Sequence, residues 1–183
     1  MLEHELIQFC APTLAGLKTG NLIALPWGEG GEKTWDLEQW NRRLGSKGVT
    51  LTVLCRKGRT ALLYVYREAR LQRDLQAAGV QTLLQHYGYQ SMEASDAIET
   101  LKRRLEDSAA FPHEIGVFLS YPLEDVVGYI RNRGKHSKAT GYWQVYGDEE
   151  RAQRLFSEYR RCKARFQQLF EEGMTVMRLT AAV

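Results

Sequence analysis

The chain has 183 residues, enough for one domain or a domain with an appendage, and a chain of this length buries roughly 70% of its unfolded surface. Lys and Arg (25) nearly balance Asp and Glu (22), so the overall charge does not favour a nucleic acid or an anionic membrane as partner. No segment approaches the ~18 consecutive apolar residues of a transmembrane helix. We therefore expect a soluble globular protein.

The N-terminus and the cysteines favour a cytoplasmic location. Met1–Leu6 is acidic and lacks the basic start, apolar middle and cleavage site of a secretory signal. Cys10, Cys55 and Cys162 are widely spaced without a C-x-x-C motif, so reduced thiols are expected. The histidines form neither H-x-x-x-H nor H-E-x-x-H, and no metal site is predicted.

The first third of the chain alternates short helices and strands. Leu2–Phe9 predicts an opening helix, and Pro12 favours the start of a brief second helix that stops near Gly20. Leu22–Leu25 is a four-residue apolar run that predicts a buried strand. The glycine-rich stretch that follows, which includes Gly28–Gly31, predicts a turn or loop and lacks the patterns that cradle phosphates.

The middle of the chain contains the clearest local signal. After a helix predicted over Thr34–Leu44, Val49–Cys55 alternates and Ala61–Tyr66 is rich in β-formers, which predicts an antiparallel hairpin with a basic four-residue tip between the two strands. Two helices are then predicted. The first covers Arg67–Ala78 and ends at Gly79, and the second covers Val80–His86.

The remaining segments complete a mixed architecture. A helix capped by Ser91 precedes Phe111–Val127, which predicts a loop, a buried strand over the apolar run 115–119, a turn and a helix started by Pro122. A basic loop, an aromatic strand and a long helix follow, with the bounds 131–138, 142–146 and 148–173. We predict one α/β domain over 1–183, with a mixed sheet of about five strands that includes the hairpin, covered by helices.

Three segments resemble an uncharacterised family, a domain of unknown function found mainly in clostridia and other anaerobic bacteria. They are Cys10–Leu22 (CAPTLAGLKTGNL), Phe111–Val126 (FPHEIGVFLSYPLEDV) and Thr140–Asp148 (TGYWQVYGD). The resemblance implies a stand-alone cytoplasmic bacterial protein. It carries no activity and no catalytic residue over to this chain.

One hypothesis for chemistry is a cysteine-dependent hydrolase. Cys10 before the predicted Pro12 helix and His113 before the predicted strand follow the order of papain-like hydrolases, with Glu114 or Gln144 to orient the histidine or stabilise an oxyanion. Neither the papain nor the caspase signature surrounds Cys10, so the analogy rests on order alone. The competing interpretation is that Cys10 is a small buried core residue.

The preferred hypothesis is a small-molecule-binding or accessory protein, with an unknown cofactor or ligand. Polar groups in an apolar cleft are the usual form of such a site, and the candidates are Lys18, Asn21, Tyr121, Tyr142 and Trp143. A further alternative is a nucleic-acid-binding module, because the segment 131–146 combines basic and aromatic side chains. A homo-oligomer through the C-terminal helix is expected if its apolar stripe stays exposed.

Overall fold

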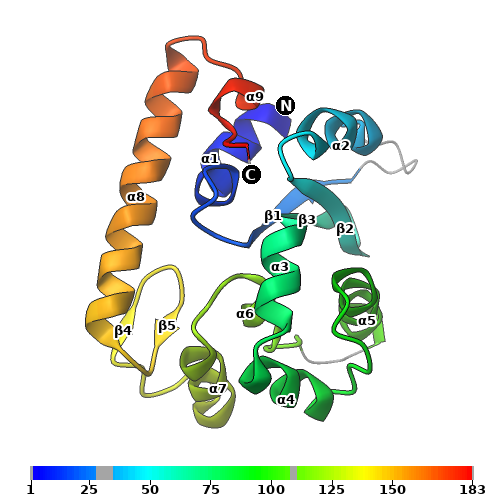
Figure 1. Ribbon diagram of the computed structural model, residues 1–183, viewed down its shortest axis with the longest axis vertical. Helices are drawn as coiled ribbons and strands as arrows, with labels where there is room; N and C mark the ends of the chain where they lie inside the picture. Colours follow the sequence, from blue (N-terminus) through cyan, green and yellow to red (C-terminus); the bar gives the residue numbers. More distant parts are fainter. Residues whose placement is uncertain (1, 28–34, 108–110, 183) are drawn as a thin grey trace. The chain divides into compact units, whose positions relative to one another are not determined.

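The computed structural model describes residues 2–27, 35–107 and 111–182, and it has the predicted mixed α/β class (Figure 1). The predicted loop that includes Gly28–Gly31 lies outside the described residues. The elements are α1 (Leu2–Leu14), β1 (Gly20–Pro26), α2 (Leu37–Gly45), β2 (Thr50–Lys57), β3 (Thr60–Tyr66), α3 (Glu68–Leu75), α4 (Ala78–His86), α5 (Ala94–Asp107), α6 (Ile115–Phe118), α7 (Leu123–Asn132), β4 (Ala139–Thr140), β5 (Gln144–Val145), α8 (Glu149–Glu171) and α9 (Val176–Leu179).

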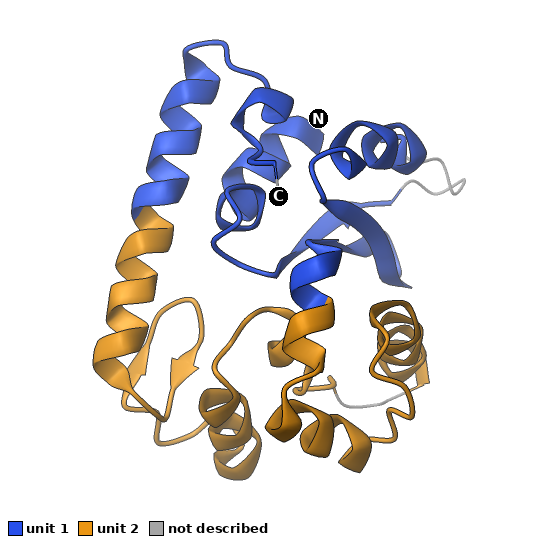
Figure 2. Ribbon diagram, viewed as in Figure 1, with its two compact units in different colours: residues 1–71, 161–183 blue, residues 72–160 orange. Residues whose placement is uncertain are grey.

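Contacts along the chain define two compact units (Figure 2). Unit 1 comprises residues 1–71 and 161–183, and unit 2 comprises residues 72–160. Helices α3 and α8 each continue from one unit into the other. The single domain over 1–183 stays a prediction.

Unit 1 contains a three-stranded antiparallel sheet in the order β1-β3-β2. The predicted hairpin is confirmed: β2 pairs with β3 from Thr50 opposite Tyr66 to Lys57 opposite Thr60. The strands run further toward the turn than predicted, so the basic tip is shorter than four residues. Strand β1 begins at a glycine because a Cβ on Gly20 would lie 2.4 Å from a ring carbon of Tyr64.

Helix α1 packs on this sheet and corrects the prediction of two short helices. The helix continues through Pro12 and ends at Leu14, and the chain turns at Gly16 with φ +79°. Proline inside a helix removes one backbone hydrogen bond. Burial of most of the helix, including Leu6 and Cys10, outweighs that loss. Cys10 therefore lies near the C-terminal end of a helix and not at a helix start.

Unit 2 is mainly helical, and its centre corrects the predicted strand over 115–119. Residues Ile115–Phe118 form the short helix α6, and all of them are buried. A run buried on every side has no periodicity that separates a strand from a buried helix. Gly116 permits the close packing, because a Cβ there would lie 2.8 Å from a methyl carbon of Val126. The helix predicted from Pro122 is confirmed as α7.

The helix break near Gly79 also differs from the prediction. Helix α3 ends at Leu75, and Gly79 lies in the first turn of α4 instead of ending the preceding helix. A Cβ on Gly79 would approach a methyl carbon of Leu123 to 2.6 Å. Packing against the start of α7 therefore requires this glycine.

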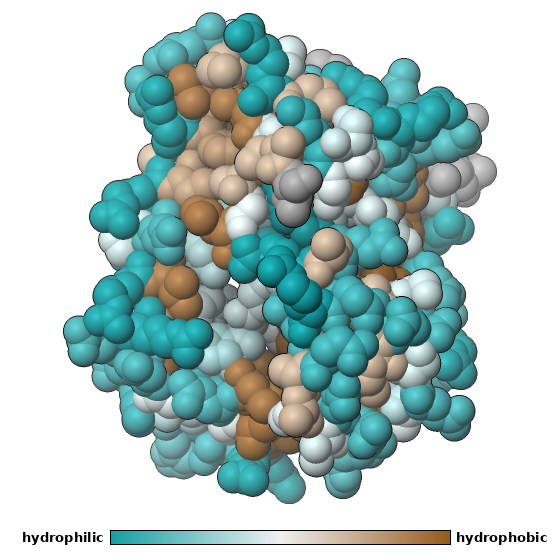
Figure 3. Space-filling model, in the orientation of Figure 1, coloured by the Kyte–Doolittle hydropathy of each residue, from teal (hydrophilic) through white to brown (hydrophobic). Residues whose placement is uncertain are grey.

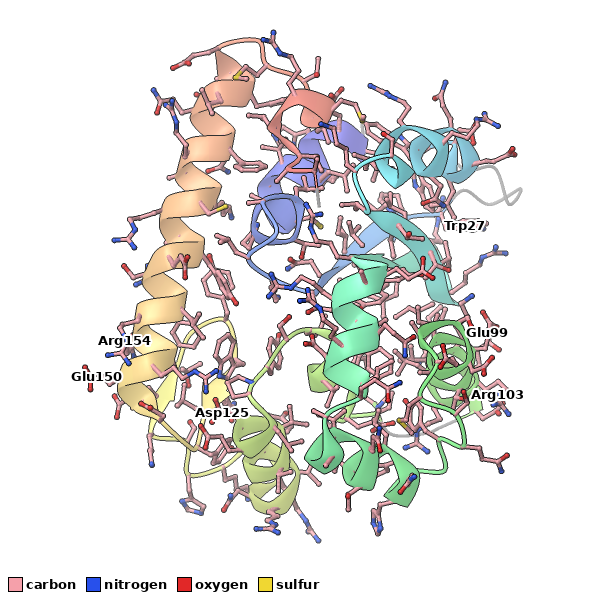
Figure 4. The ribbon with its side chains drawn as sticks, in the orientation of Figure 1. Trp27, Glu99, Arg103, Asp125, Glu150 and Arg154 are labelled. Atoms are coloured by element: carbon pink, nitrogen blue, oxygen red, sulfur yellow. The ribbon has the colours of Figure 1, made fainter. Side chains whose placement is uncertain are left out.

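The predicted aromatic strand is shorter than expected. Only Gln144–Val145 is extended, and it pairs antiparallel with Ala139–Thr140, so the strands of the described chain divide between two sheets. Buried Asp125 from α7 holds this small hairpin, because its carboxylate accepts hydrogen bonds from the Trp143 indole (2.7 Å) and the Tyr146 amide (2.7 Å). Figure 4 shows Asp125 beside the hairpin.

Helix α8 confirms the predicted long C-terminal helix. Asp148 caps its start by accepting from the Arg151 amide (2.9 Å), and Gly173 follows its end with φ +94°. The apolar stripe contributes Phe156 and Tyr159 to unit 2 and Phe166 to the core of unit 1, and all three are buried. In the face shown in Figure 3, hydrophilic and hydrophobic side chains alternate along α8. The homo-oligomer stays a prediction, and the remaining stripe residues Leu155, Cys162, Leu169 and Phe170 are half-buried.

Candidate functional site

The predicted residues of unit 1 lie around the turn that follows α1. Cys10 is fully buried, and burial raises the pKa of its thiol, while the nearby Lys18 charge opposes this. Burial also lowers the pKa of Lys18 to about 8. The side chain of Asn21 accepts a hydrogen bond from the Thr13 hydroxyl (2.7 Å). A buried thiol with a raised pKa is the opposite of an activated nucleophile.

The predicted catalytic partners of Cys10 belong to unit 2. His113 is exposed in a turn before α6, and its ring lies 4.9 Å from that of Tyr129. Gln144 accepts a hydrogen bond from the Tyr146 hydroxyl (3.0 Å). Neither the helix start at Cys10 nor the strand after His113 forms, so the two local features that favoured a hydrolase are absent from the described chain. The pairing of Cys10 with His113 stays a prediction.

The predicted aromatic ligand-binding residues form part of the core of unit 2. The rings of Tyr121 and Trp143 lie 5.1 Å apart, and Trp143 packs edge-on against Phe156 at 4.5 Å. Tyr142 contacts Phe156 and Tyr159 from α8. Trp143 is 6% exposed, and its indole N–H is satisfied by Asp125. This cluster fixes the hairpin on α8, and its aromatic faces pack against one another.

Glu114 leads to the strongest candidate site. Its side chain is 1% exposed and accepts hydrogen bonds from the guanidinium of Arg104 on α5 (2.5 Å) and from the hydroxyl of Tyr89 (3.3 Å). Arg104 also donates from Nη1 to the main-chain carbonyl of Tyr87 (3.1 Å) and lies over the Tyr87 ring. A buried carboxylate thus holds a partly exposed guanidinium in one orientation.

The end of α4 brings these groups together. Gly88 adopts φ +86°, and the amides of Gly88 and Tyr89 bond to the carbonyls of Gln85 (3.0 Å) and Leu84 (3.1 Å). This is a Schellman ending, which needs a left-handed residue after the helix and satisfies its last carbonyls. The reversal places Tyr87 beside Arg104 and turns Tyr89, which is 1% exposed, toward Glu114.

Two adjoining hollows lie along the polar side of α5, and we call them together the α5 groove. One has a volume of about 320 Å³ and is lined by Tyr87, Gly88, Thr100, Arg103, Arg104 and Asp107. The other, of about 340 Å³, shares Gly88, Thr100 and Arg103 with it and continues to Gln90, Ser91, Asp96 and Glu99. Arg103 and Glu99 both project from α5 (Figure 4). The opposite side of this helix, with Ile98 and Leu101, is buried in the core.

The electrostatics of the groove depend on the buried ion pair. Burial by itself lowers the pKa of Arg104, but the hydrogen bond and the charge of Glu114 outweigh it, so the pKa is raised. Burial first, and then the Glu114 charge, raise the pKa of Tyr89, which keeps its hydroxyl protonated as a donor. Nη2 of Arg104 bonds to no acceptor among the described residues. An arginine donor therefore remains for a ligand.

The groove can bind an anion by charge-assisted hydrogen bonds. Its first hollow has two guanidinium groups, Arg103 and Arg104, against one carboxylate, Asp107. The planar guanidinium matches carboxylate and phosphate oxygens in a two-point geometry. Arg103 and Arg104 are off the apolar face of α5 and belong to no motif, so no local sequence pattern marks them as site residues. Among the predicted site residues, Glu114 alone belongs to this network.

The described part of the chain offers neither a metal-binding cluster nor a membrane-spanning helix. No group of three or more His, Cys, Asp or Glu side chains is placed to hold a metal ion in residues 2–27, 35–107 and 111–182. Within the same ranges, every helix is too short or too polar to cross a membrane.

Comparisons with known proteins give one match. No similar chain is found among curated proteins or among solved structures. Residues 6–180, nearly the whole chain, match the family described as "Protein of unknown function (DUF3793)". The chain belongs to this family.

Proposed function

We propose that this protein is a small-molecule-binding protein that takes an anionic ligand, a carboxylate or a phosphate compound, in the first hollow of the α5 groove. The second hollow has Asp96 and Glu99 against Arg103 and does not favour an anion. The observation that carries the proposal is the guanidinium of Arg104, held at the groove by Glu114, which is 1% exposed. A pre-oriented donor binds without the loss of side-chain entropy that a free surface arginine suffers on binding. Such a role agrees with the preferred sequence hypothesis of a ligand-binding or accessory protein.

The contacts of Arg104 support binding more than simple stabilisation. An ion pair that served stability alone would be expected to use all the hydrogen bonds of both partners, because only that offsets the desolvation of the buried charges. Here the carboxylate is buried, whereas the side chain of Arg104 is 30% exposed and lines a hollow. Arg103 lies beside it, with its guanidinium bonded to the Thr100 hydroxyl (3.0 Å). Two neighbouring cations favour a ligand with more than one negative oxygen.

The test is a calorimetric titration of the full chain with inorganic phosphate, succinate, citrate and a sugar phosphate. We expect at least one of these probes to bind, with an affinity that falls as salt increases. Arg104→Lys keeps the charge but loses the planar fork, and we expect affinity to fall about tenfold or more. Arg103→Gln, at an exposed position, gives a second readout that does not touch the Glu114 ion pair.

The matched control is Arg154→Lys on α8. Arg154 is also a helical arginine paired with a glutamate, Glu150, at 2.7 Å, but both side chains are mostly exposed (Figure 4). We expect this variant to bind the probe within a factor of about two of the natural chain. Absence of binding by every probe, or equal affinity of the Arg104→Lys and natural chains, would overturn the proposal.

A further inference from the structure

A second segment of unit 2 is rich in positive charge, and Glu124 and Asp148 border it at the Gly147 end. The stretch from Val126 to Gly147 contains four Lys and Arg residues and no Asp or Glu. The cations are Arg131, Arg133, Lys135 and Lys138, all exposed. None of them forms an ion pair within the described residues. The chain as a whole is close to neutral, so this is a local concentration of positive charge.

The backbone of the same loop presents donors. Arg133, Gly134 and His136 have φ of 51°, 72° and 62°, so the chain coils tightly after α7. The amides of Arg133, Gly134 and Lys135 bond to carbonyls of α7. The amides of His136 and Ser137 bond to no acceptor in the described part of the chain. Adjacent N–H groups in such a turn form a concavity suited to an anion such as a phosphate.

Aromatic rings border the loop. The ring of Tyr129 lies 4.9 Å from that of His113, and a Cβ on Gly134 would lie 3.1 Å from Tyr129. The hydroxyl oxygen of Tyr146 also lies 3.1 Å from the carbonyl oxygen of Lys135. His113 is exposed, and Tyr129 and Tyr146 are partly exposed. Tyr142 and Trp143, the other aromatic residues of the segment 131–146, pack against α8.

We propose that this surface, made by Arg131, Arg133, Lys135, His113, Tyr129 and Tyr146, binds single-stranded nucleic acid. Cations and free amides fit the phosphates, and rings beside them offer faces on which bases stack. An anionic membrane would also fit the charge and the exposed Phe111 ring, which lies 6.2 Å from that of His113, so phosphatidylserine vesicles are one arm of the test. The inference is independent of the α5 groove, with which this surface shares no residue.

The test measures fluorescence anisotropy of a labelled twelve-nucleotide oligo-dT and oligo-U with the full chain. Three phosphate contacts predict a slope of about −2 in log affinity against log salt, so affinity should fall roughly 20-fold from about 50 to 200 mM salt. The triple variant Arg131→Gln, Arg133→Asn, Lys135→Gln should remove most of that slope. Asparagine is chosen for position 133 because it tolerates the left-handed backbone.

A second variant tests stacking separately from charge. His113→Ala, at an exposed position, should lower oligonucleotide affinity about fivefold or more and leave the salt slope unchanged. The charge-matched control removes Arg151, Arg154 and Arg160, which are exposed on α8, and should leave affinity within about threefold. Arg104→Lys should also have no effect, which separates this surface from the groove.

Several results would overturn the assignment. One is the absence of oligonucleotide binding at about 50 mM salt. Another is equal binding of inorganic polyphosphate or of phosphatidylserine vesicles, together with an unchanged affinity of His113→Ala. Either of these would mean that the loop recognises charge alone or nothing at all.

Discussion

Arg67 in unit 1 is a buried cation and Arg104 in unit 2 is a partly buried one, and their hydrogen-bond partners differ. Arg67 is 1% exposed and donates four hydrogen bonds to main-chain carbonyls of the described residues, those of Thr13, Leu14, Lys47 and Ala181. Burial, followed by the charge of Arg70, lowers the pKa of Arg67. Arg104 instead pairs with a buried carboxylate, and its pKa is raised.

Arg67 uses its N–H groups to hold the fold together, whereas Arg104 keeps N–H groups that a ligand can accept from. The carbonyls of Thr13 and Leu14 are at the end of α1, where the helix dipole places partial negative charge. Arg67 donates to both of these carbonyls and also to a carbonyl in the turn after α2 and to one in the C-terminal tail. These four hydrogen bonds use nearly all of its N–H groups. Arg104 is balanced mainly by one carboxylate and one carbonyl. Its remaining N–H groups line a hollow.

The largest expected effect is from removal of the unit 1 cation. Arg67→Met should lower the free energy of unfolding by about 4 kcal/mol, because it leaves several buried carbonyls without donors. Urea unfolding measures this. The control is Arg70→Met, since Arg70 is only partly buried and bonds to the carbonyls of Gly16 and Leu17, and it should cost about 1 kcal/mol. Equal losses for the two variants would contradict the central role of Arg67.

The next largest effect is expected when Glu114, the buried partner of the unit 2 ion pair, loses its charge. Glu114→Gln should lower the free energy of unfolding by about 2 kcal/mol, a value reduced because Arg104 is 30% exposed and keeps some hydration. It should also weaken binding in the α5 groove, since Arg104 loses its fixed orientation. Glu150→Gln on the exposed pair with Arg154 should change stability by less than about 0.5 kcal/mol. A Glu114→Gln chain of unchanged stability would contradict this interpretation.

An effect of similar size, which appears only as a dependence on pH, concerns a second buried cation of unit 1. The pKa of Lys18 is lowered to about 8 from 10.5, so the unfolded chain binds more protons between these values and stability should rise with pH in that window. Lys18→Met removes this dependence. Relative to the variant, the natural chain should gain about 2 kcal/mol of unfolding free energy between about pH 7 and 9.5.

Urea unfolding at several pH values checks this sign. The difference between the two chains isolates Lys18 from the other groups that titrate in the same range. If the difference in unfolding free energy between the two chains is constant from about pH 7 to 9.5, folding does not lower the pKa of Lys18, and the prediction is wrong. In that case Arg67 would be the only one of these two unit 1 cations whose pKa is lowered by burial, in contrast to the raised pKa of Arg104.

Local patterns predicted the elements whose signal lies within a few residues. The β2–β3 hairpin follows from alternation in Val49–Cys55 and from β-formers in Ala61–Tyr66 on either side of a short basic tip. Helix α8 follows from an apolar stripe between a capping Asp148 and Gly173. The resemblance to an uncharacterised family was confirmed as well. The apolar run 115–119 was predicted wrongly because burial on all sides removes the periodicity that separates strand from helix.

The candidate sites depend on contacts that no local pattern encodes. Glu114 could be identified as a polar residue next to a buried run, but its partner Arg104 lies ten residues earlier on another helix. Arg67 bonds to carbonyls 53 and 54 residues before it and to one 114 residues after it. The sequence alone determined which residues are apolar, charged or turn-forming. The tertiary structure decided which cation is satisfied by the backbone and which keeps donors for a ligand, because hydrogen-bond satisfaction depends on groups that only folding brings together.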